Sequence, residues 1–464
     1  MLTNFFILMK QELIVTVLIF ILLIIKIGKD RTNESIINLV NALLLINLIA
    51  GFVYNQQGSL FSDMFRTTPL AVLEKNILSL GTLIISLQSY SWLRTHKHVL
   101  EFYILLLSTL LGMFFMISAG NLLMFYLGLE LSTIPLAALA NFDLEKRRSS
   151  EAAMKLIISS AFSSGLLLFG ISMIYGTTGT LAFSEMPQLL NGQPLQLFAF
   201  VLLLAGFAFK ISVVPFHLWT ADVYEGAPVA VTSYLSVISK GAVVFVFLSV
   251  LYTVFKPLSS SWYNMLFLLS VLTILIGNLF AIRQNNIKRF LAFSSIAQVG
   301  FILVGITGSS RLGTASVIYF VLIYVFSNLA AFGVVSLVSA LTGREAISDY
   351  KGFYKTNPVL SWVLTIALFS LAGVPPTAGF FGKFFLLMSG AGKGNYILIT
   401  IAALNMVISF YYYLRIVKAI FMDANEQPIE RLSIPAFPQL ALYLCIAGIL
   451  FTGLASYVYN YIHA

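Results

Sequence analysis

A few ionisable residues lie within long apolar stretches of the sequence. They are Lys75, Lys155, Lys210, Lys240, Lys383, Glu74 and Glu130. A charged side chain at the centre of a bilayer costs about 2.5–3.5 kcal/mol on insertion scales, so each of them requires an explanation. Desolvation in general lowers the pKa of a lysine, and a nearby carboxylate raises it again. A lysine with a movable carboxylate partner can therefore hold or release a proton near neutral pH, which is the chemistry of a proton relay.

The depth of each residue in its apolar stretch separates relay candidates from surface residues. Lys210, Lys240 and Lys383 have apolar sequence on both sides, and a static buried ion pair is the alternative to a relay for them. Lys75 stands in the first turns of its expected helix, where a lysine can extend to the surface, and we favour that interpretation. Lys155 follows Glu151 by four residues, the spacing of a helical ion pair, so both a structural and a relay interpretation stay open.

Prolines predict breaks in the helices that carry three of these residues. The pairs are Lys210 with Pro215, Glu130 with Pro135, and Lys383 with Pro375 and Pro376. A proline removes a backbone donor and frees the carbonyl of the residue four positions earlier. Broken helices at mid-membrane depth line polar cavities and build ion sites in transporters.

The expected order of the relay follows from these positions. Glu130 would modulate Lys210, Lys240 and His217 would pass the proton along the membrane plane, and Lys383 would exchange it with one face. A channel for metal ions would instead use rings of carbonyls or carboxylates. The lysines therefore favour a proton path over a sodium path.

The composition of the chain predicts that these residues are carried by membrane-spanning helices. Of the 464 residues, 59% are hydrophobic and only 10% are charged, and the mean hydropathy is +0.94. About 20 apolar residues cross a hydrocarbon core, and about fourteen such windows can be placed, from residues 12 to 26 through 436 to 462. Windows of this length fit helices, because a membrane strand is about half as long. We therefore expect an all-α polytopic membrane protein.

The basic residues predict the orientation of these helices. Loops after odd-numbered helices hold Lys26, Lys29, Arg31, Arg94, Lys97, Lys146, Arg147, Arg148, Arg283, Lys288, Arg289, Arg344, Lys351, Lys355, Arg415, Lys418 and Arg431. The opposite side holds Lys10, Arg66, Lys256, Arg311 and Lys393. By the positive-inside rule the first set is cytoplasmic, which places both termini on the outer side. The net charge of +9 thus reflects membrane orientation and does not predict nucleic-acid binding.

Cofactor sites within the chain are not expected. The single cysteine, Cys445, cannot form a disulfide framework, a thiolate zinc site or the ligand set of an iron-sulfur cluster. The sequence contains no H-E-x-x-H pair and no phosphate-binding loop between a strand and a helix.

The two lysine-bearing breaks at Pro215 and Pro375–Pro376 suggest an internal duplication. Each break falls in the fourth helix of a five-helix unit, and five is odd, so the second unit enters from the opposite membrane face. We expect helices 1–3 in residues 1–98, a first inverted repeat (helices 4–8) in 99–252, a second (helices 9–13) in 253–420, and helix 14 in 421–464.

Four motifs resemble the antiporter-like, Mrp-related membrane subunits of proton-translocating NADH:quinone oxidoreductase, respiratory complex I. They are Phe209 to Trp219 continuing through Asp222 to Pro228, Ile287 to Ile296, Tyr324 to Phe332, and Gly373 to Pro376 leading to Gly379 through Phe384. The resemblance covers essentially the whole chain. Ala221 departs from the pattern, which usually has proline there, and Phe293 and Phe301 stand where tyrosine is common.

The resemblance implies roles for individual residues and for partner proteins. It assigns proton-relay roles to Glu130, Lys210, Lys240 and Lys383, and Lys155 matches a further lysine in helix 6. It implies a translocase subunit in a bacterial inner membrane beside antiporter-like subunit M, small subunits K and J, and the A/H region of the membrane arm. NADH, FMN, iron-sulfur clusters and quinone would belong to partner subunits, and this chain would hold none of them.

Three alternatives remain open from the sequence. A subunit of an Mrp-type cation/proton antiporter shares the Lys210 and Lys383 motifs. A membrane subunit of a related hydrogenase complex predicts a nickel-iron partner. A purely structural scaffold predicts that Lys210→Ala leaves proton pumping intact.

Overall fold

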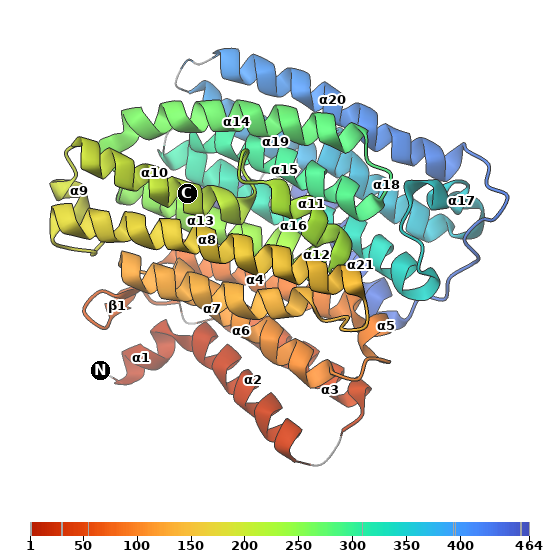
Figure 1. Ribbon diagram of the computed structural model, residues 1–464. Helices are drawn as coiled ribbons and strands as arrows, with labels where there is room; N and C mark the ends of the chain where they lie inside the picture. The colour runs from red at the N-terminus through yellow and green to blue at the C-terminus, as the bar shows by residue number, and fades with distance from the viewer. Residues whose placement is uncertain are drawn as a thin grey trace.

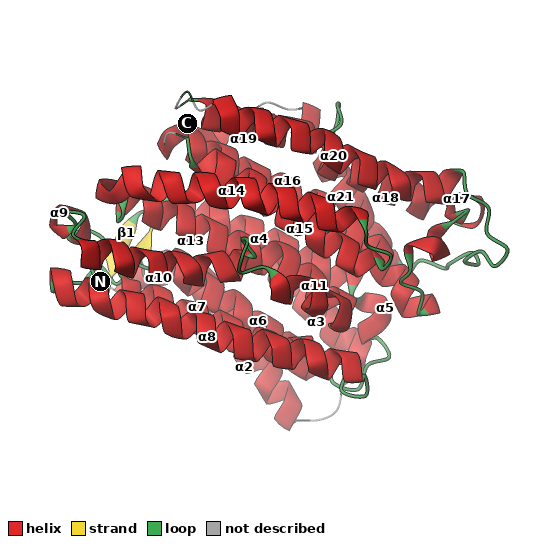
Figure 2. Cartoon of the chain, turned by 45° about the horizontal axis from the view of Figure 1, so that its top comes forward, coloured by secondary structure: helices red, strands yellow, loops and turns green. Residues whose placement is uncertain are grey.

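The computed structural model is a bundle of helices that lie roughly side by side, with one small β-hairpin at one end (Figures 1 and 2). It describes residues 2–28, 31–53, 55–308, 310–392, 394, 396–454 and 457–463. Lys29 and Lys393, which the charge pattern assigns to opposite sides, lie outside the described residues. The hairpin is a small addition to the all-α fold expected from the sequence.

The first half of the chain contains the hairpin and the first broken helix. Its elements are α1 (Leu2–Leu8), α2 (Lys10–Ile27), α3 (Asn33–Ala50), β1 (Gly58–Leu60), β2 (Phe65–Thr67), α4 (Pro69–Gln88), α5 (Tyr90–Leu93), α6 (Val99–Ile117), α7 (Leu122–Ala140), α8 (Arg147–Thr178), α9 (Met186–Leu189), α10 (Pro194–Ile211), α11 (Leu218–Gly226), α12 (Val229–Tyr234), the π-helical turn η1 (Leu235–Ser239) and α13 (Lys240–Thr253).

The second half contains the other broken helix and the C-terminal helices. Its elements are the 3-10 turn η2 (Lys256–Leu258), α14 (Ser259–Ile282), α15 (Ile287–Ile306), α16 (Ser310–Thr342), the 3-10 turn η3 (Ile347–Tyr350), α17 (Phe353–Thr356), α18 (Pro358–Ala372), α19 (Ala378–Ala391), α20 (Tyr396–Phe421), α21 (Ala436–Leu454) and α22 (Tyr457–His463).

Twelve helices in the described part of the chain are long and apolar enough to cross a membrane. Two of the fourteen expected windows are not among them. The first coincides with α2, which has the length of a span but carries three charged residues, Lys10, Glu12 and Lys26. The other is divided between α18 and α19, each of which is shorter than a full span. The chain is a multi-pass membrane protein, and the count of fourteen stays a prediction.

Burial divides the helices into an inner and an outer group. The apolar windows of α15, α16 and α12–α13 are 94%, 89% and 89% buried, whereas those of α3 and α20 are each 33% buried. The outer helices expose large apolar side chains, among them Ile24, Ile46 and Val407. Extended apolar surface of this kind suits contact with lipid.

The two broken helices cross the bundle in opposite directions. Helix α10 begins at the end where α9 and β1 lie, and α11 continues from it, whereas α18 begins beside α17 at the opposite end and α19 continues from it (Figures 1 and 2). Both breaks were expected from their prolines. The opposite directions agree with an inverted arrangement of the two units.

The prediction of a break at Pro135 is wrong. Helix α7 runs continuously from Leu122 to Ala140 with Pro135 inside it. An irregularity that no proline predicts lies at the π-helical turn η1, which ends directly before Lys240. Single π turns inside helices occur frequently at functional sites.

The prediction that the Lys75 side chain extends to the surface is also wrong. Its side chain is 1% exposed and forms an ion pair with Glu12, whose side chain is also 1% exposed. The Lys75 ammonium also lies 5.2 Å from the centroid of the Phe65 ring. The pair joins α2 to α4, and the first turn of α2 supplies an acid that the sequence analysis had not counted among the intramembrane carboxylates.

Glycines allow α6 and α7 to approach each other closely. A Cβ atom at Gly112 would lie 2.5 Å from the backbone nitrogen of Ser132, and one at Gly128 would lie 2.7 Å from that of Met116. Small residues at such crossings are typical of membrane helix packing. The contact fixes the part of α7 that carries Glu130.

A methyl group at this crossing is expected to destabilise the protein. Gly112→Ala and Gly128→Ala should each lower the stability by about 1–3 kcal/mol, the usual range for overpacking, because the obstructing atoms are backbone atoms. Thermal unfolding of the purified membrane assembly measures the effect. The control is Gly165→Ala in α8, where a Cβ meets no atom within 4 Å. Equal unfolding temperatures for all three variants and the unmodified protein would contradict this packing argument.

Candidate functional site: lysines beside irregular backbone

Lys210 stands in the last turn of α10, directly before the first break. Its ammonium donates hydrogen bonds to the hydroxyls of Thr133 on α7, at 2.8 Å, and Ser160 on α8, at 2.7 Å. A cation near the C-terminus of a helix also interacts favourably with the helix dipole. Two hydroxyls and a helix end thus hold the charge of Lys210 without a carboxylate in direct contact.

Glu130 lies one turn before Thr133 on the same helix. It is half-buried, and its Oε1 atom is buried without a hydrogen-bond partner in the described part of the chain. The charge of Glu130 acts on Lys210, yet the Lys210 ammonium donates to two hydroxyls and forms no ion pair with Glu130 among the described residues. The expected pairing is therefore present as a neighbouring charge and not as a salt bridge.

The break between α10 and α11 is held by side chains. Ser212 adopts a left-handed conformation with φ +66°, and its hydroxyl accepts a hydrogen bond from Thr220 at 2.6 Å. Trp219 donates from its indole nitrogen to the carbonyl of Phe209 at 3.1 Å. His217 directly precedes α11, is 8% exposed, and its Nδ1 atom has no partner among the described residues. The break thus contains an imidazole with a buried, unused nitrogen.

Lys240 is the first residue of α13 and is 4% exposed. Its ammonium donates to the hydroxyl of Ser295 on α15 at 2.8 Å and lies 5.2 Å from the centroid of the Tyr224 ring. Tyr224 belongs to α11, the second half of the first broken helix. This ring places Lys240 next to the helix that continues from Lys210.

Polar contacts continue from Lys240 toward the second break through α16. Asn328 donates to Ser236 at 2.8 Å, and Ser236 lies in η1, one turn before Lys240. Beside Asn328, Ser327 shares a hydrogen bond with Ser370 at 2.7 Å, and Ser370 stands in the last turn of α18. Polar side chains of η1, α16 and α18 are therefore connected in pairs between the two breaks.

Lys383 stands in α19 and is fully buried, with 0% exposure. Its side chain extends toward the end of α18, and its ammonium donates to the carbonyl of Ala372 at 3.2 Å. Ala372 is the last residue of α18, and its carbonyl has no helical donor because the helix ends there, at the left-handed Gly373. The centroid of the Phe301 ring lies 4.7 Å from the same ammonium. The departure from tyrosine at Phe301 thus gives Lys383 an aromatic face and no hydroxyl.

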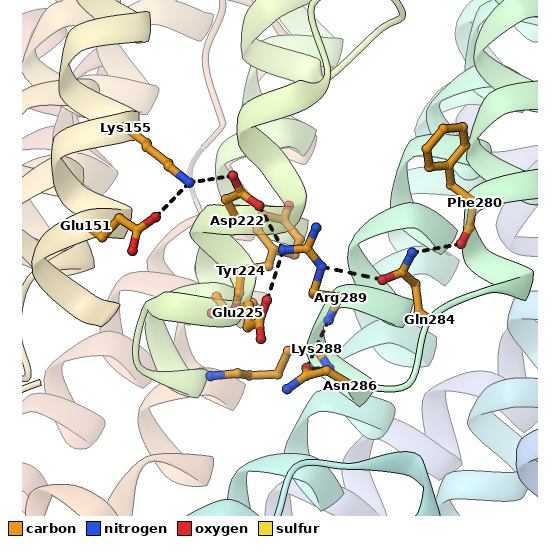
Figure 3. A network of polar contacts seen from close by, with 11 residues as sticks. Glu151, Lys155, Asp222, Tyr224, Glu225, Phe280, Gln284, Asn286, Lys288 and Arg289 are labelled. Carbon is orange, nitrogen blue, oxygen red and sulfur yellow. Dashed lines mark hydrogen bonds and ion pairs between the residues drawn. The ribbon is translucent and has the colours of Figure 1, made fainter. Parts of the chain in front are cut away.

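Lys155 is not brought together with these buried residues. Its side chain is 42% exposed, and it forms ion pairs with Glu151 at 2.8 Å and Asp222 at 2.7 Å (Figure 3). The ion pair expected from the i, i+4 spacing of Glu151 and Lys155 is confirmed. Burial by itself would raise the pKa of Asp222, but hydrogen bonds from Lys155 and Arg289 more than offset it and hold this pKa below its ordinary value.

Arg289 extends this network to α15. Its Nη1 atom lies 2.7 Å from Asp222 and 2.9 Å from Glu225, both on α11 (Figure 3). The neighbouring Lys288 is buried and forms an ion pair with Glu345 at 3.0 Å. Sequence reasoning missed these pairs because their partners are far apart in the chain. Two features of the sequence could have predicted these pairs. They are the acids Asp222 and Glu225 after the first break and the bases Lys288 and Arg289 in the first turn of α15.

The arrangement can move protons and offers little to a metal ion. No group of three or more histidine, cysteine, aspartate or glutamate side chains that could hold a metal occurs among the described residues. Lys210, Lys240 and Lys383 donate to hydroxyl or carbonyl oxygens, and each is adjacent to a break or a π turn. Irregular backbone within a membrane protein is tolerated where it is buried or lines a polar cavity.

Comparisons with known proteins agree along the whole chain. The family described as NADH:quinone oxidoreductase/Mrp antiporter, TM, matches residues 119–409. Subunit N of NADH-quinone oxidoreductase from Phocaeicola vulgatus is 47% identical over 457 residues, covering 97% of each chain. The corresponding subunit from Pelagibacter ubique is 38% identical and covers 90% of this chain and 89% of its own.

Solved structures show the same fold. A chain of respiratory complex I from Thermus thermophilus with bound aureothin has a TM-score of 0.83 and 27% identity, covering 96% of this chain and 97% of its own. A chain of the Mrp complex from Dietzia has a TM-score of 0.87 at 20% identity, covering 98% and 95%, and shows the fold alone. With a family match over most of its length and these relatives, the chain belongs to the NADH:quinone oxidoreductase and Mrp antiporter family of transmembrane proteins.

Proposed function

We propose that the chain is a membrane-arm subunit of a proton-translocating NADH:quinone oxidoreductase, equivalent to subunit N. The observation that carries this proposal is the placement of Lys210, Lys240 and Lys383 beside irregular backbone in the interior. The 47% identity to subunit N of Phocaeicola vulgatus over nearly the whole chain supports the choice of complex. The division of residues 99–252 and 253–420 into inverted repeats is part of the proposal, and the opposite directions of the two broken helices support it.

The proposed relay runs from Glu130 through Lys210, His217 and Lys240 to Lys383. Lys210 keeps its proton while hydroxyls hold the ammonium, and movement of Glu130 toward or away from it changes how firmly the proton is held. The unused Nδ1 of His217 can accept or donate a proton within the break. Lys240 and Lys383 then carry the charge along the membrane plane.

Lys155 acts in this proposal through its partner. It and Arg289 hold Asp222, and Asp222 belongs to α11, the half-helix that follows the first break. The network therefore positions α11, and with it Tyr224 beneath Lys240. Lys155 is a positioning residue that affects the relay through the orientation of this half-helix.

Electron transfer is proposed to occur in other subunits. NADH, FMN, iron-sulfur clusters and quinone would be bound there, and this chain would supply only proton-carrying side chains. The proposed neighbours are antiporter-like subunit M, small subunits K and J, and the A/H region of the membrane arm. Moving one charge against 100 mV costs about 2.3 kcal/mol, so the energy must arrive from those neighbours.

The proposed location is a bacterial inner membrane with both termini on the periplasmic side, as the basic residues favour.

An Mrp-type antiporter or a related membrane-bound complex is the second candidate. The likeness to the Dietzia Mrp complex and, at 24% identity, to an archaeal sulfane sulfur reductase complex supports the fold and does not discriminate between these functions. Purification through a tag on this chain discriminates. Copurifying flavin and iron-sulfur subunits support our proposal, whereas a flavin-free assembly that exchanges sodium for protons would overturn it.

Substitution of either Glu130 or Lys210 should lower proton pumping. Lys210→Ala and Glu130→Gln are each expected to reduce quinone-coupled acidification per NADH oxidised, because neither variant can complete the proton transfer. Acidification by membrane vesicles and NADH oxidation are measured together. Lys418→Met is the matched control, because Lys418 on α20 is 65% exposed. Unchanged acidification in both test variants would count against the relay and favour a structural scaffold.

The hydroxyl that holds Lys240 provides a milder test. Ser295→Ala removes this acceptor, and a hydrogen bond to a charged group contributes about 1.5–3 kcal/mol. Lys240 should then hold its proton less firmly, and acidification per NADH should fall. Ser163→Ala on α8 is the control, since the buried Ser163 hydroxyl has no partner among the described residues. Equal losses in both serine variants would show that deletion of any buried hydroxyl has this effect.

A further inference from the structure

Helix α4 carries a stripe of buried polar residues that the proposed relay does not use. The stripe consists of Lys75, Ser79, Thr82 and Ser86 in α4 and of Ser89 directly after it, and each of them is at most 1% exposed. Steps of four and three residues keep side chains on one face of a helix. At 1.5 Å per residue the stripe extends over about 21 Å, which is most of a hydrocarbon core of about 30 Å.

Side chains from the first spans and from α6 face this stripe. Glu12 of α2 forms the ion pair with Lys75, and Asn47 of α3 donates to Ser79 at 3.1 Å. Ser86 donates to the Oδ1 atom of Asn41, also on α3, at 2.6 Å. The Ser86 hydroxyl additionally lies 2.9 Å from the hydroxyl of Tyr103 on α6. The stripe is therefore matched by polar groups at three successive levels of α4.

Each level also contains a buried polar atom that no protein group satisfies. These atoms, among the described residues, are Oε2 of Glu12, Oδ1 of Asn47 and Nδ2 of Asn41, on side chains that are 1%, 0% and 8% exposed. An unsatisfied buried polar atom costs about 1–3 kcal/mol. Ordered water satisfies such atoms in protein interiors. Three of them along one helix face point to water molecules between α4 and helices α2 and α3.

Static packing explains this layer less well than proton exchange does. A buried ion pair is often no more stable than apolar residues of the same volume, so helix packing alone does not require Glu12 and Lys75. Packing also leaves the three unsatisfied atoms without a partner. The middle of α4 packs against the turn that precedes Lys240, because a Cβ at Gly81, next to Thr82, would collide with the side chain of Ile238 in η1.

We propose that Glu12 and Lys75 form a second proton-exchange site, connected by a file of buried water along α4. A proton delivered by water to Oε2 of Glu12 neutralises the carboxylate and weakens the ion pair. Lys75 then releases one proton to the water beside Ser79. Transfer of the proton from Glu12 to Lys75 restores the ion pair, so one proton enters and one leaves in each cycle. The site serves the membrane face at which α2 begins.

The double variant Glu12→Gln with Lys75→Met tests the site while keeping its shape and leaving no unpaired charge. Assembled complex carrying it should show a loss of acidification per NADH oxidised. The control is Lys26→Met with Glu101→Gln, an exposed ion pair of 3.2 Å that joins α2 to α6. The control variant should pump as the unmodified complex does. Unmodified pumping in the Glu12/Lys75 variant would overturn the proposal.

A second variant applies if the first does not assemble. Ser79→Ala with Ser86→Ala leaves the ion pair in place and removes two hydroxyls from the stripe, and it should also lower acidification. A map of the unmodified complex that resolves ordered water should show water at Oε2 of Glu12, Oδ1 of Asn47 and Nδ2 of Asn41. A dry stripe, or normal pumping in the serine variant, would overturn the proposal. If Lys210→Ala still lowers pumping in that case, the proposed function stands without this site.

Discussion

The cost of keeping an ammonium group in an apolar interior governs the arrangement of this protein. That cost is about 2.5–3.5 kcal/mol on insertion scales. A hydrogen bond from a charged donor returns about 1.5–3 kcal/mol, and a desolvated cation–π contact about 2. Two such contacts are enough to compensate this cost, and two are found at the partly buried Lys210 and at the buried Lys240 and Lys383. Lys75 is instead paired with the carboxylate of Glu12.

Irregular backbone supplies part of this compensation. A regular helix uses all of its interior carbonyls, so it has none to offer a neighbouring ammonium. The end of α18 frees the carbonyls of Leu371 and Ala372, which accept from Gln298 and Lys383. The left-handed Ser212 costs of order 1–3 kcal/mol in backbone strain, and contacts from Thr220 and Trp219 around the break hold it in place. The positions of the lysines and of the irregular backbone therefore depend on each other, because irregular backbone helps to stabilise the ammonium groups.

The sequence predicted the features that depend on local patterns. Apolar windows located the helices, prolines located the breaks after Lys210 and before Lys383, and the i, i+4 spacing predicted the pair of Glu151 with Lys155. Features that depend on distant partners were missed. The pairing of Lys75 with Glu12 joins residues 63 positions apart, and no local signal distinguishes it from a lysine that extends to the surface. Pro135 shows the opposite error, because a proline predicted a break where helix α7 is continuous.

The surroundings of Lys383 have a consequence for the last step of any relay that passes through it. Hydroxyls beside Lys210 and Lys240 can receive one hydrogen and give up another, so they can hand a proton onward. The carbonyl of Ala372 accepts a hydrogen bond and the ring of Phe301 faces the cation, but neither carries a hydrogen that it could donate onward, although both stabilise the charge. In a relay through Lys383, a proton would therefore stay on this ammonium until a water molecule reached it. The rate of proton release would then depend on access of water to Lys383, and not on the basicity of the amine alone.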